Sequence, residues 1–479
     1  MKHQSVLFFI SKLVTALIAF LLVVIRSREF PPESLSDYYL VTKSTSIIIA
    51  VLITWVPESC MRFYKETTNK KTFYSTYGIS LAFSCFIALV VSALLGLVPG
   101  FDSIYAFFPY ITMLVLTQGI NDSISAAFRM SGNALRYSAS LILSSCLNLM
   151  VFLVLPAKIG VGSIFIAVAA SYLAGGVFGF FVLKIYKNFS IHSFDKHLLK
   201  QSLQYATPLA VVWCSIWIFT SSDTFVINLF CDKEQVSYYN MAEGIVAQSI
   251  GTILSSFSFA IFPSMIAQWN PESPHDLETA LGGALSLILK YLIPSVIGLA
   301  TISFYIYGPI IDPAYNPNNE GSFLICLFSI SQLMDIFFQT YAKIWNLEKK
   351  TIASAIVSMG SAIFNLAFTI LAVRISKSYL WAAGITVITI FLRTIITVFL
   401  FRRKFKISIH FKTVALSTLA SLIMAAVLFL FLNYTTTNIW TVLVSVIFGV
   451  IIFVSLMSIF GEMNGELNQI GRFFVRRKK

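Results

Sequence analysis

The sequence predicts an all-α polytopic membrane protein with about fourteen transmembrane helices. Two observations lead to this fold class. Apolar residues make up 57% of the chain and charged residues only 11%, which excludes an ordinary soluble globular protein. Apolar runs of about 20 residues recur along the whole chain, and each is long enough to cross a hydrocarbon core of roughly 30 Å as a helix.

The first six spans are expected before a polar break in the chain. They are predicted at 5–25, 39–61, 78–98, 104–127, 137–157 and 162–183. A polar segment from Lys184 to Gln201 follows the sixth span. Because polar groups are expensive inside a bilayer, this segment is the candidate boundary between two lobes. The sequence therefore predicts an N-terminal lobe over residues 1–200.

Eight further spans are expected after that boundary. Six of them are predicted at 206–230, 237–266, 279–308, 321–344, 352–373 and 378–401. These six would form a C-terminal lobe over residues 201–406. A last pair near 413–432 and 438–460 has no counterpart in the first lobe. Residues 407–479 are therefore predicted to be two additional helices followed by a basic cytoplasmic tail.

The stretch from Gln204 to Asn270 is the part around which the chain is organised. Its two spans turn sharply at Cys231–Glu234 and would form a hairpin with acidic residues in both arms. A second hairpin begins the chain. A Tyr-Tyr pair with a charged residue four positions after it occurs at 38–43 and again at 238–243. This short repeat suggests a duplicated unit.

The net charge of +13 is explained by membrane topology. An N-terminus in the cytoplasm places most basic residues on that side, as the positive-inside rule requires. This side would hold Arg62, Lys65, Lys70, Lys71, Arg129, Arg136, Lys184, Lys187, Lys196, Lys200, Lys349, Lys350, Arg402, Arg403, Lys404, Lys406 and Arg476–Lys479. An even number of spans then puts both termini in the cytoplasm. Attraction to anionic lipid headgroups accounts for the charge without a nucleic-acid partner.

Several classes of enzyme are excluded by what the sequence lacks. The six cysteines show no paired metal-ligand spacing, so no metal site is predicted. No Gly-rich loop precedes a Lys-Ser or Lys-Thr pair, so the chain is not expected to hydrolyse nucleotide. The five histidines fall at polar ends or in cytoplasmic loops, whereas a membrane acyltransferase needs a base at membrane depth. The chain is therefore expected to be a transporter without a cofactor, not an enzyme.

Charged residues inside the predicted spans are the candidates for function. Each costs about 2.5–3.5 kcal/mol at the centre of a span, so it faces a partner or a water-filled cavity. Four are basic and three acidic: Lys12, Lys43, Lys290 and Arg393, with Asp223, Glu243 and Asp335. An anionic cargo needs fixed positive charge along its route, because a phosphate cannot otherwise leave water. The acids would hold the cations in an empty cavity or bind a coupling proton or sodium ion.

A structural role is the alternative for each of these residues. Lys43 and Glu243 lie about one turn inside their spans, so their side chains could snorkel to the interface. Lys12 and Lys290 lie about 10–17 Å deep by helical rise, which favours a cavity, and Arg393 is placed similarly. The two aspartates could instead pair with these cations as structural bridges.

Prolines and glycines predict where helices bend or approach closely. Pro57 and Pro294 each remove a helix hydrogen bond and permit a kink. Gly175 and Gly179 form a small-residue pair, which indicates close packing of helices inside the monomer rather than dimerisation.

Several segments resemble one family of transporters in order and spacing. Residues 30–39 are similar to the turn after the first span of polysaccharide flippases, and the Arg-Phe-Tyr segment at Arg62 is similar to the end of their second span. Similarities to their seventh, eighth and ninth spans lie at 204–209, 223, 236–239, 262–263, 291–298 and 312–315. Together these segments resemble the polysaccharide transporter branch of the multidrug/oligosaccharidyl-lipid/polysaccharide (MOP) exporter superfamily, whose type is the Wzx O-antigen flippase.

The resemblance implies two pseudo-symmetric six-helix lobes, as in MATE transporters, with extra C-terminal helices and alternating access. Its cargo would be a polyprenyl-pyrophosphate-linked oligosaccharide that crosses the bacterial inner membrane to the periplasmic leaflet, for O-antigen, lipopolysaccharide or another surface polysaccharide. Lys12, Lys43, Lys290 and Arg393 would screen the pyrophosphate. Other partners would be membrane lipids, a coupling proton or sodium ion and the polysaccharide polymerase machinery. Thr224 departs from the family, whose members often carry Arg at this position.

Three other functions remain open at this point. A multidrug exporter of the same superfamily would bind a cation, and its acidic residues would matter more than its lysines. A peptidoglycan-precursor flippase would carry a similar anionic cargo, but its loss would be lethal in any background. A membrane polymerase would set polysaccharide chain length and would need a catalytic site in the outer loops, which are short.

Overall fold

The chain is helical throughout the part that the structure, a computed structural model, describes. This part comprises residues 2–95, 105–131, 134–155, 159–254, 265, 275–348, 351–402 and 405–463. Within it the only β-type pairing is an isolated bridge between Tyr307 and Ile311. The predicted all-α fold is confirmed, and the helices divide into two compact units that are described separately below.

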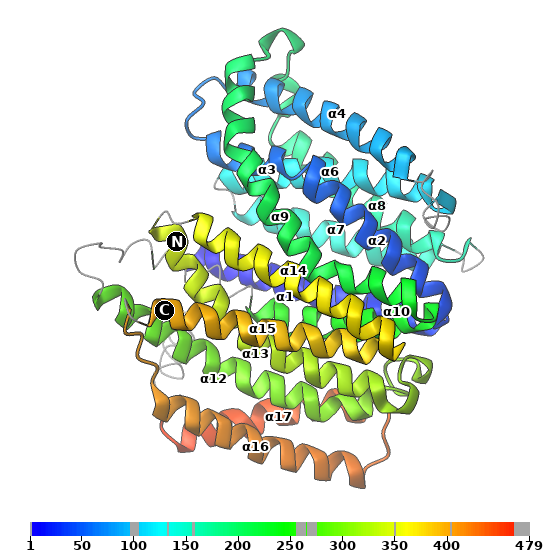
Figure 1. The fold of residues 1–479 in the computed structure, drawn as a ribbon, viewed down its shortest axis with the longest axis vertical. Coiled ribbons are helices and arrows are strands. Elements are labelled where there is room, and N and C mark those ends of the chain that lie inside the picture. Colours follow the sequence, from blue (N-terminus) through cyan, green and yellow to red (C-terminus); the bar gives the residue numbers. More distant parts are fainter. Residues whose placement is uncertain are drawn as a thin grey trace, which may run out of the picture. The chain divides into compact units, whose positions relative to one another are not determined.

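Unit 1 consists of Met1–Asn240 together with Ala355–Ile385. Its helices, shown from blue to green in Figure 1, are α1 (Lys2–Glu29), α2 (Pro32–Leu52), α3 (Trp55–Phe63), α4 (Lys70–Leu95), α6 (Phe108–Met130), α7 (Ala134–Val154), α8 (Gly162–Val182) and α9 (Lys196–Phe230). Short 3-10 turns at Ile185–Lys187 and Ile191–Ser193 occupy the polar segment between α8 and α9.

Unit 2 consists of Met241–Ser354 together with Thr386–Lys479. Its helices are α12 (His275–Ile306), α13 (Glu320–Leu347), α16 (Phe411–Tyr434) and α17 (Ile439–Ile459). Three further helices have residues in both units: α10 (Lys233–Val246), α14 (Thr351–Ser376) and α15 (Tyr379–Phe401). A π-helical turn, Ala247–Gly251, continues directly from α10.

The protein is a multi-pass membrane protein. Among the described residues, ten helices are long and apolar enough to span a bilayer, or eleven if α2 and α3 form one bent span. Each of the predicted spans contains a helix in the structure. Large apolar side chains on α17, such as Trp440 at 73% exposure and Ile447 at 62%, remain uncovered by protein. Such a surface is stable only when lipid covers it.

Two helix boundaries follow directly from local chemistry. The span predicted at 206–230 corresponds to the apolar segment Leu209–Phe230 of α9. The helix itself begins earlier, at Lys196, where the Asp195 carboxylate accepts hydrogen bonds from the backbone N–H groups of His197 and Leu198. The second predicted span is bent by 46° between α2 and α3. The bend lies at Ile53, four residues before Pro57, where a proline ring clashes with the helix carbonyl. Of the two prolines considered, Pro57 thus lies beside a bend, whereas α12 continues through Pro294.

Close packing of α8 on α6 depends on glycine. A Cβ atom added at Gly179 would lie 2.3 Å from Ile124 Cγ2, and one at Gly175 would lie 2.5 Å from Asn121 Oδ1. No real side chain tolerates such distances without displacement of its neighbour. The predicted role of this small-residue pair in packing within the monomer is confirmed.

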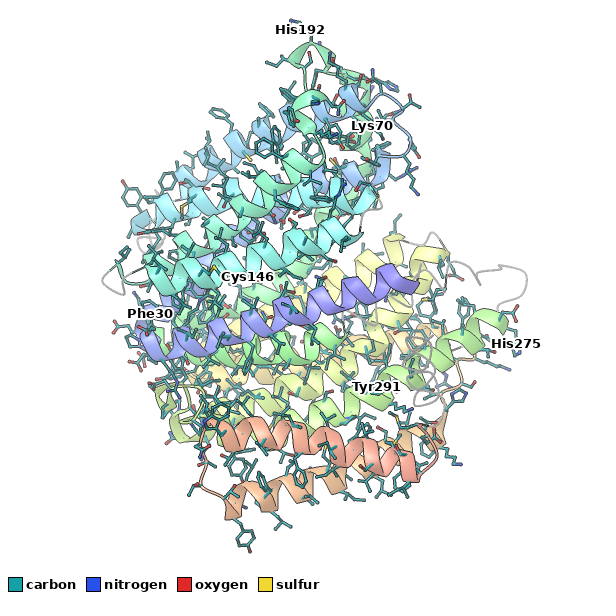
Figure 2. The ribbon with its side chains drawn as sticks, turned by 180° about the vertical axis from the view of Figure 1, so that it is seen from behind. Phe30, Lys70, Cys146, His192, His275 and Tyr291 are labelled. Atoms are coloured by element: carbon teal, nitrogen blue, oxygen red, sulfur yellow. The ribbon has the colours of Figure 1, made fainter. Side chains whose placement is uncertain are left out.

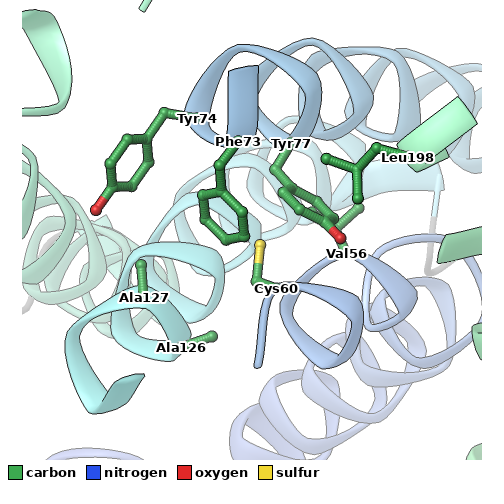
Figure 3. Packing of buried hydrophobic residues seen from close by; sticks show 8 residues of the cluster. All are labelled: Val56, Cys60, Phe73, Tyr74, Tyr77, Ala126, Ala127 and Leu198. Carbon is green, nitrogen blue, oxygen red and sulfur yellow. The ribbon is translucent and has the colours of Figure 1, made fainter. Parts of the chain in front are cut away.

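A compact apolar core lies at one end of unit 1. Figure 3 shows its members, which come from α3, α4, α6 and α9: Val56, Cys60, Phe73, Tyr74, Tyr77, Ala126, Ala127 and Leu198. The Phe73 and Tyr77 rings lie 4.7 Å apart between centroids. The Tyr77 hydroxyl is hydrogen-bonded to Ser202 Oγ at 2.8 Å, which joins α4 to the start of α9. This core therefore ties the polar segment before α9 to the rest of unit 1.

Candidate functional site

Lys43 connects α2 to α9 inside unit 1. Its ammonium group donates a hydrogen bond of 3.0 Å to the backbone carbonyl of Thr220. The Trp217 indole N–H donates in the opposite direction, to the Lys43 carbonyl at 3.0 Å and to Ser46 Oγ at 2.9 Å. The Lys43 side chain is partly exposed. The contact with the Thr220 carbonyl therefore positions the ammonium group between α2 and α9.

Lys12 belongs to a group of four charged side chains in unit 1. The Arg129 guanidinium on α6 acts electrostatically on Lys12 of α1, on Glu58 of α3 and on Asp122 of the same helix. We call these four residues the Arg129 group. Two cations and two acids are thus drawn from three helices. Each of the other three members therefore lies close enough to Arg129 for its charge to interact with the guanidinium.

Three members of the Arg129 group were not predicted as site residues. Glu58 and Asp122 both lie within predicted spans, so the rule that selected the other acids applies to them as well. Arg129 lies near the end of α6, and its charge was assigned to the cytoplasmic interface. Its influence on Lys12 depends on the packing of α1 and α6, which the sequence does not show.

Asp335 and Arg393 form an ion pair between α13 and α15 in unit 2. The side chains are 17% and 9% exposed, and the guanidinium lies over the Phe338 ring with Cζ 4.0 Å from its centroid. The amide group of Gln339 donates a hydrogen bond of 2.7 Å to the second carboxylate oxygen of Asp335. The structure therefore joins two predicted site residues directly. In this conformation their charges satisfy each other.

Lys290 points toward the end of α17. Its side chain is 3% exposed, and its ammonium group donates a hydrogen bond of 2.6 Å to the backbone carbonyl of Glu462. The carboxylate of Glu462 accepts a bond of 2.9 Å from the Thr413 hydroxyl on α16. Glu462 lies in the turn that follows α17, whose last residue is Ile459. These contacts support a role for Lys290 in holding the C-terminal helices against α12.

Replacement of Lys290 by methionine is expected to weaken this attachment. The change removes one charge-assisted hydrogen bond, a loss of about 1.5–3 kcal/mol, and retains most of the side-chain volume. We expect a lower thermal midpoint and faster proteolysis after α17 in the purified protein. Lys412→Met, at an exposed position on α16, is the control. An unchanged midpoint together with loss of transport would instead assign Lys290 to the cargo path.

The acids of α9 and α10 differ in their surroundings. Asp223 is 3% exposed, and one of its carboxylate oxygens accepts a hydrogen bond of 2.6 Å from the Tyr239 hydroxyl. Thr224, the residue that departs from the family pattern, bonds to Asn240 at 3.1 Å. These contacts join α9 to α10. Glu243 is partly exposed and lies four residues before the π-helical turn, a feature that often marks functional sites.

Metal binding and cysteine chemistry receive no support from the described residues. Within them, no group of three or more His, Cys, Asp or Glu side chains could hold a metal ion. Cys231, in the turn between α9 and α10, lies outside the spans. Burial raises the pKa of its thiol, an effect that Lys377 partly offsets. A thiol with a raised pKa is a weak nucleophile and a weak metal ligand at neutral pH.

Several solved structures of transporters resemble this chain in fold. Lipid II flippase MurJ in an inward closed conformation aligns with a TM-score of 0.73 at 15% identity, over 96% of this chain and 99% of that one. An inward-facing multidrug resistance MATE family transporter aligns with a TM-score of 0.65 at 16% identity, over 84% of this chain and 98% of that one. A MOP superfamily transporter from Pyrococcus furiosus aligns with a TM-score of 0.59 at 15% identity, over 84% of this chain and 95% of that one.

The sequence comparison identifies the family. Residues 3–269, more than half of the chain, match the family described as polysaccharide biosynthesis protein. No curated protein matches the sequence. The chain therefore belongs to the polysaccharide biosynthesis protein family, and its fold is that of the MOP superfamily transporters.

Proposed function

We propose that this protein is a flippase that moves a polyprenyl-pyrophosphate-linked oligosaccharide from the cytoplasmic to the periplasmic leaflet of a bacterial inner membrane. The family match over residues 3–269 carries the proposal, because it connects the chain to polysaccharide assembly. A structure of the same fold belongs to a flippase whose substrate, Lipid II, is a lipid. O-antigen and other surface polysaccharides are the products that such a step would serve.

The proposed architecture has fourteen spans, of which the described residues support ten or eleven by length and composition. Residues 1–200 and 201–406 would form two six-helix lobes that work by alternating access, and residues 407–479 would add the C-terminal helix pair. Both termini would lie in the cytoplasm, which the distribution of Lys and Arg favours. Inverted or duplicated halves of this kind are common among secondary transporters.

The proposed pyrophosphate path uses Lys12, Lys43, Lys290 and Arg393. Lys43 is the strongest member, because it is partly exposed within a membrane-spanning helix and the Thr220 carbonyl holds its ammonium group in position. Lys12 is the second strongest candidate, because the positive charge of Arg129 acts on it. Two like charges repel each other, and an anion between them would relieve the repulsion.

The two deeper cations would join the path only after a rearrangement. Arg393 would first have to leave Asp335, and Lys290 would have to leave the Glu462 carbonyl. The acids Asp223, Glu243 and Asp335 are proposed to bind a coupling proton or sodium ion or to pair with cations. Glu243 and Asp335 are both partly exposed, whereas Asp223 is buried.

The test follows radiolabelled lipid-linked sugars in a strain that lacks the gene. Finished repeat units are expected to accumulate on the cytoplasmic face, and the intact gene should restore their passage. We expect Lys43→Gln to reduce passage about tenfold or more, since loss of a charge-assisted contact costs about 1.5–3 kcal/mol. Lys71→Gln, at an exposed position on α4, is the control and should behave as wild type.

The same strain separates the competing functions. Normal passage of the units with a change only in drug tolerance would contradict the flippase and favour a multidrug exporter. Lethality in every background would favour a peptidoglycan-precursor flippase. Normal passage with altered polysaccharide chain length would favour a polymerase.

A further inference from the structure

Arg26 is a buried cation that no predicted site includes. It lies in the last turn of α1, four residues before Phe30, which Figure 2 labels at the end of that helix. Its side chain is only 8% exposed. A guanidinium group stays protonated at every physiological pH, so a full positive charge is enclosed within unit 1. Burial on this scale rules out simple snorkelling of the side chain to the membrane interface.

The hydrogen bonds of Arg26 are incomplete on one edge. Nη1 donates to the Tyr38 hydroxyl at 3.0 Å. Nε and Nη2 are buried, and neither finds a hydrogen-bond acceptor among the residues that the structure describes. An unmet donor on a buried charged group costs more than the usual penalty of about 1–3 kcal/mol for a neutral group. The side chain is therefore held in an unfavourable state unless something else binds this edge.

The Nε–Nη2 edge has a specific shape. Its N–H bonds point in nearly parallel directions and match the two oxygens of a carboxylate or a phosphate, which is why arginine binds these groups in a bidentate manner. No carboxylate of the described chain pairs with Arg26. Asp37, the residue before Tyr38 on α2, pairs with Lys233 at 3.5 Å. Among the described residues no carboxylate occupies this edge, which has the geometry to bind an oxyanion.

Aromatic rings enclose the guanidinium group. Cζ of Arg26 lies 5.1 Å from the ring centroid of Tyr38 on α2 and 5.6 Å from that of Phe152 on α7. Tyr172 on α8 also interacts with it electrostatically. Cation–π contacts stabilise the charge by about 0.5–2 kcal/mol, but they supply no acceptor for an N–H group. We call Arg26, Tyr38, Phe152 and Tyr172 the Arg26 cluster.

We propose that the Nε–Nη2 edge of Arg26 is a binding site for an oxyanion, either a phosphate or a carboxylate group. Both nitrogens are buried here, so the site is closed, and occupancy requires a local opening between α1, α2 and α7. The identity of the ligand rests on the proposed function. We take the oxyanion to be part of the cargo, either its phosphate or an acidic sugar, and it would bind near the C-terminal end of α1. The phosphate of a bilayer lipid is the other source of the same chemistry.

The effect on stability distinguishes this site from a structural arginine. If Arg26 only supports packing through its rings, Arg26→Met lowers the thermal midpoint of the ligand-free protein. If Arg26 is a ligand site, the same change removes a buried cation with unmet donors, and the midpoint rises because apolar replacement of buried charge is often neutral or stabilising. Function and stability then change in opposite directions.

The experiment uses the full chain in phosphatidylcholine nanodiscs with inorganic pyrophosphate as the probe. A ligand that binds only the folded state raises the midpoint, so titration of the midpoint reports affinity. We expect Arg26→Met to weaken pyrophosphate binding about tenfold or more, and Arg26→Lys to do nearly as much because lysine lacks the two-pronged edge. Arg28→Met, at an exposed position two residues further on, should bind as wild type.

A second set of measurements distinguishes a cargo oxyanion from a lipid phosphate as the group that binds Arg26. Nanodiscs that contain phosphatidylglycerol, without soluble anion, should stabilise wild type over Arg26→Met only if a lipid phosphate occupies the site. The proposal is overturned if Arg26→Met lowers the midpoint and leaves both pyrophosphate and lipid effects unchanged. These measurements use purified protein, so they remain decisive even if lipid-linked sugars prove to cross the membrane without this chain.

Discussion

Replacement of Arg393 by alanine is expected to destabilise the protein by about 3–5 kcal/mol, because it leaves the Asp335 carboxylate without its cation at a largely buried position. The change also removes the contact of the guanidinium with the Phe338 ring at 4.0 Å. The thermal midpoint of purified protein and the cellular yield both report this loss. A midpoint equal to that of wild type would show that the ion pair of the structure contributes nothing.

A double replacement separates stability from transport at this position. Arg393→Met with Asp335→Leu removes both charges and keeps similar volumes, so most of the stability should return. If Arg393 also meets the pyrophosphate, passage of lipid-linked sugars stays low in the double variant despite normal yield. If passage returns together with stability, the pair is structural and Arg393 leaves the proposed cargo path.

Gly282→Ala and Gly283→Ala are expected to have opposite effects, although the residues are neighbours in α12. A Cβ atom at position 282 would lie 2.1 Å from the backbone carbonyl oxygen of Ser408, whereas one at position 283 meets no atom within 4 Å. Overpacking typically costs about 1–3 kcal/mol. Alanine in an open helical position instead stabilises by about 0.5–1 kcal/mol relative to glycine.

The clash at Gly282 affects the connection between α15 and α16. This segment lies along α12 through two hydrogen bonds of 2.8 Å, from the Lys406 amide to Glu278 and from the His410 amide to Ser286. Displacement of Ser408 would strain both bonds. Thermal midpoints of the two variants provide the comparison, each serving as the control for the other. Equal midpoints would show that α12 and this connection are not in close contact.

The two proposed anion-binding regions differ in what the sequence could reveal. Lys12 and Lys43 stand out because they interrupt apolar runs, which is a local pattern. Arg26 is near the end of a span, where arginine usually reaches the interface, and its sequence position suggested nothing more. Only the packing of Tyr38 and Phe152 around it shows that its charge is enclosed. The enclosure depends on side chains from three helices, which come together only in the folded protein.

By itself the sequence determined that the chain is an all-helical membrane protein, where its helices lie and where one span bends. These properties depend on hydropathy and on proline geometry at Pro57, both of which act within a few residues. Only the tertiary structure decided that Asp335 pairs with Arg393, that Lys290 holds the end of α17 and that one edge of Arg26 finds no partner among the described residues. The physical reason is that the partner of a buried charge is set by contacts between residues far apart in the chain, whereas the cost of burying that charge is visible at its own position.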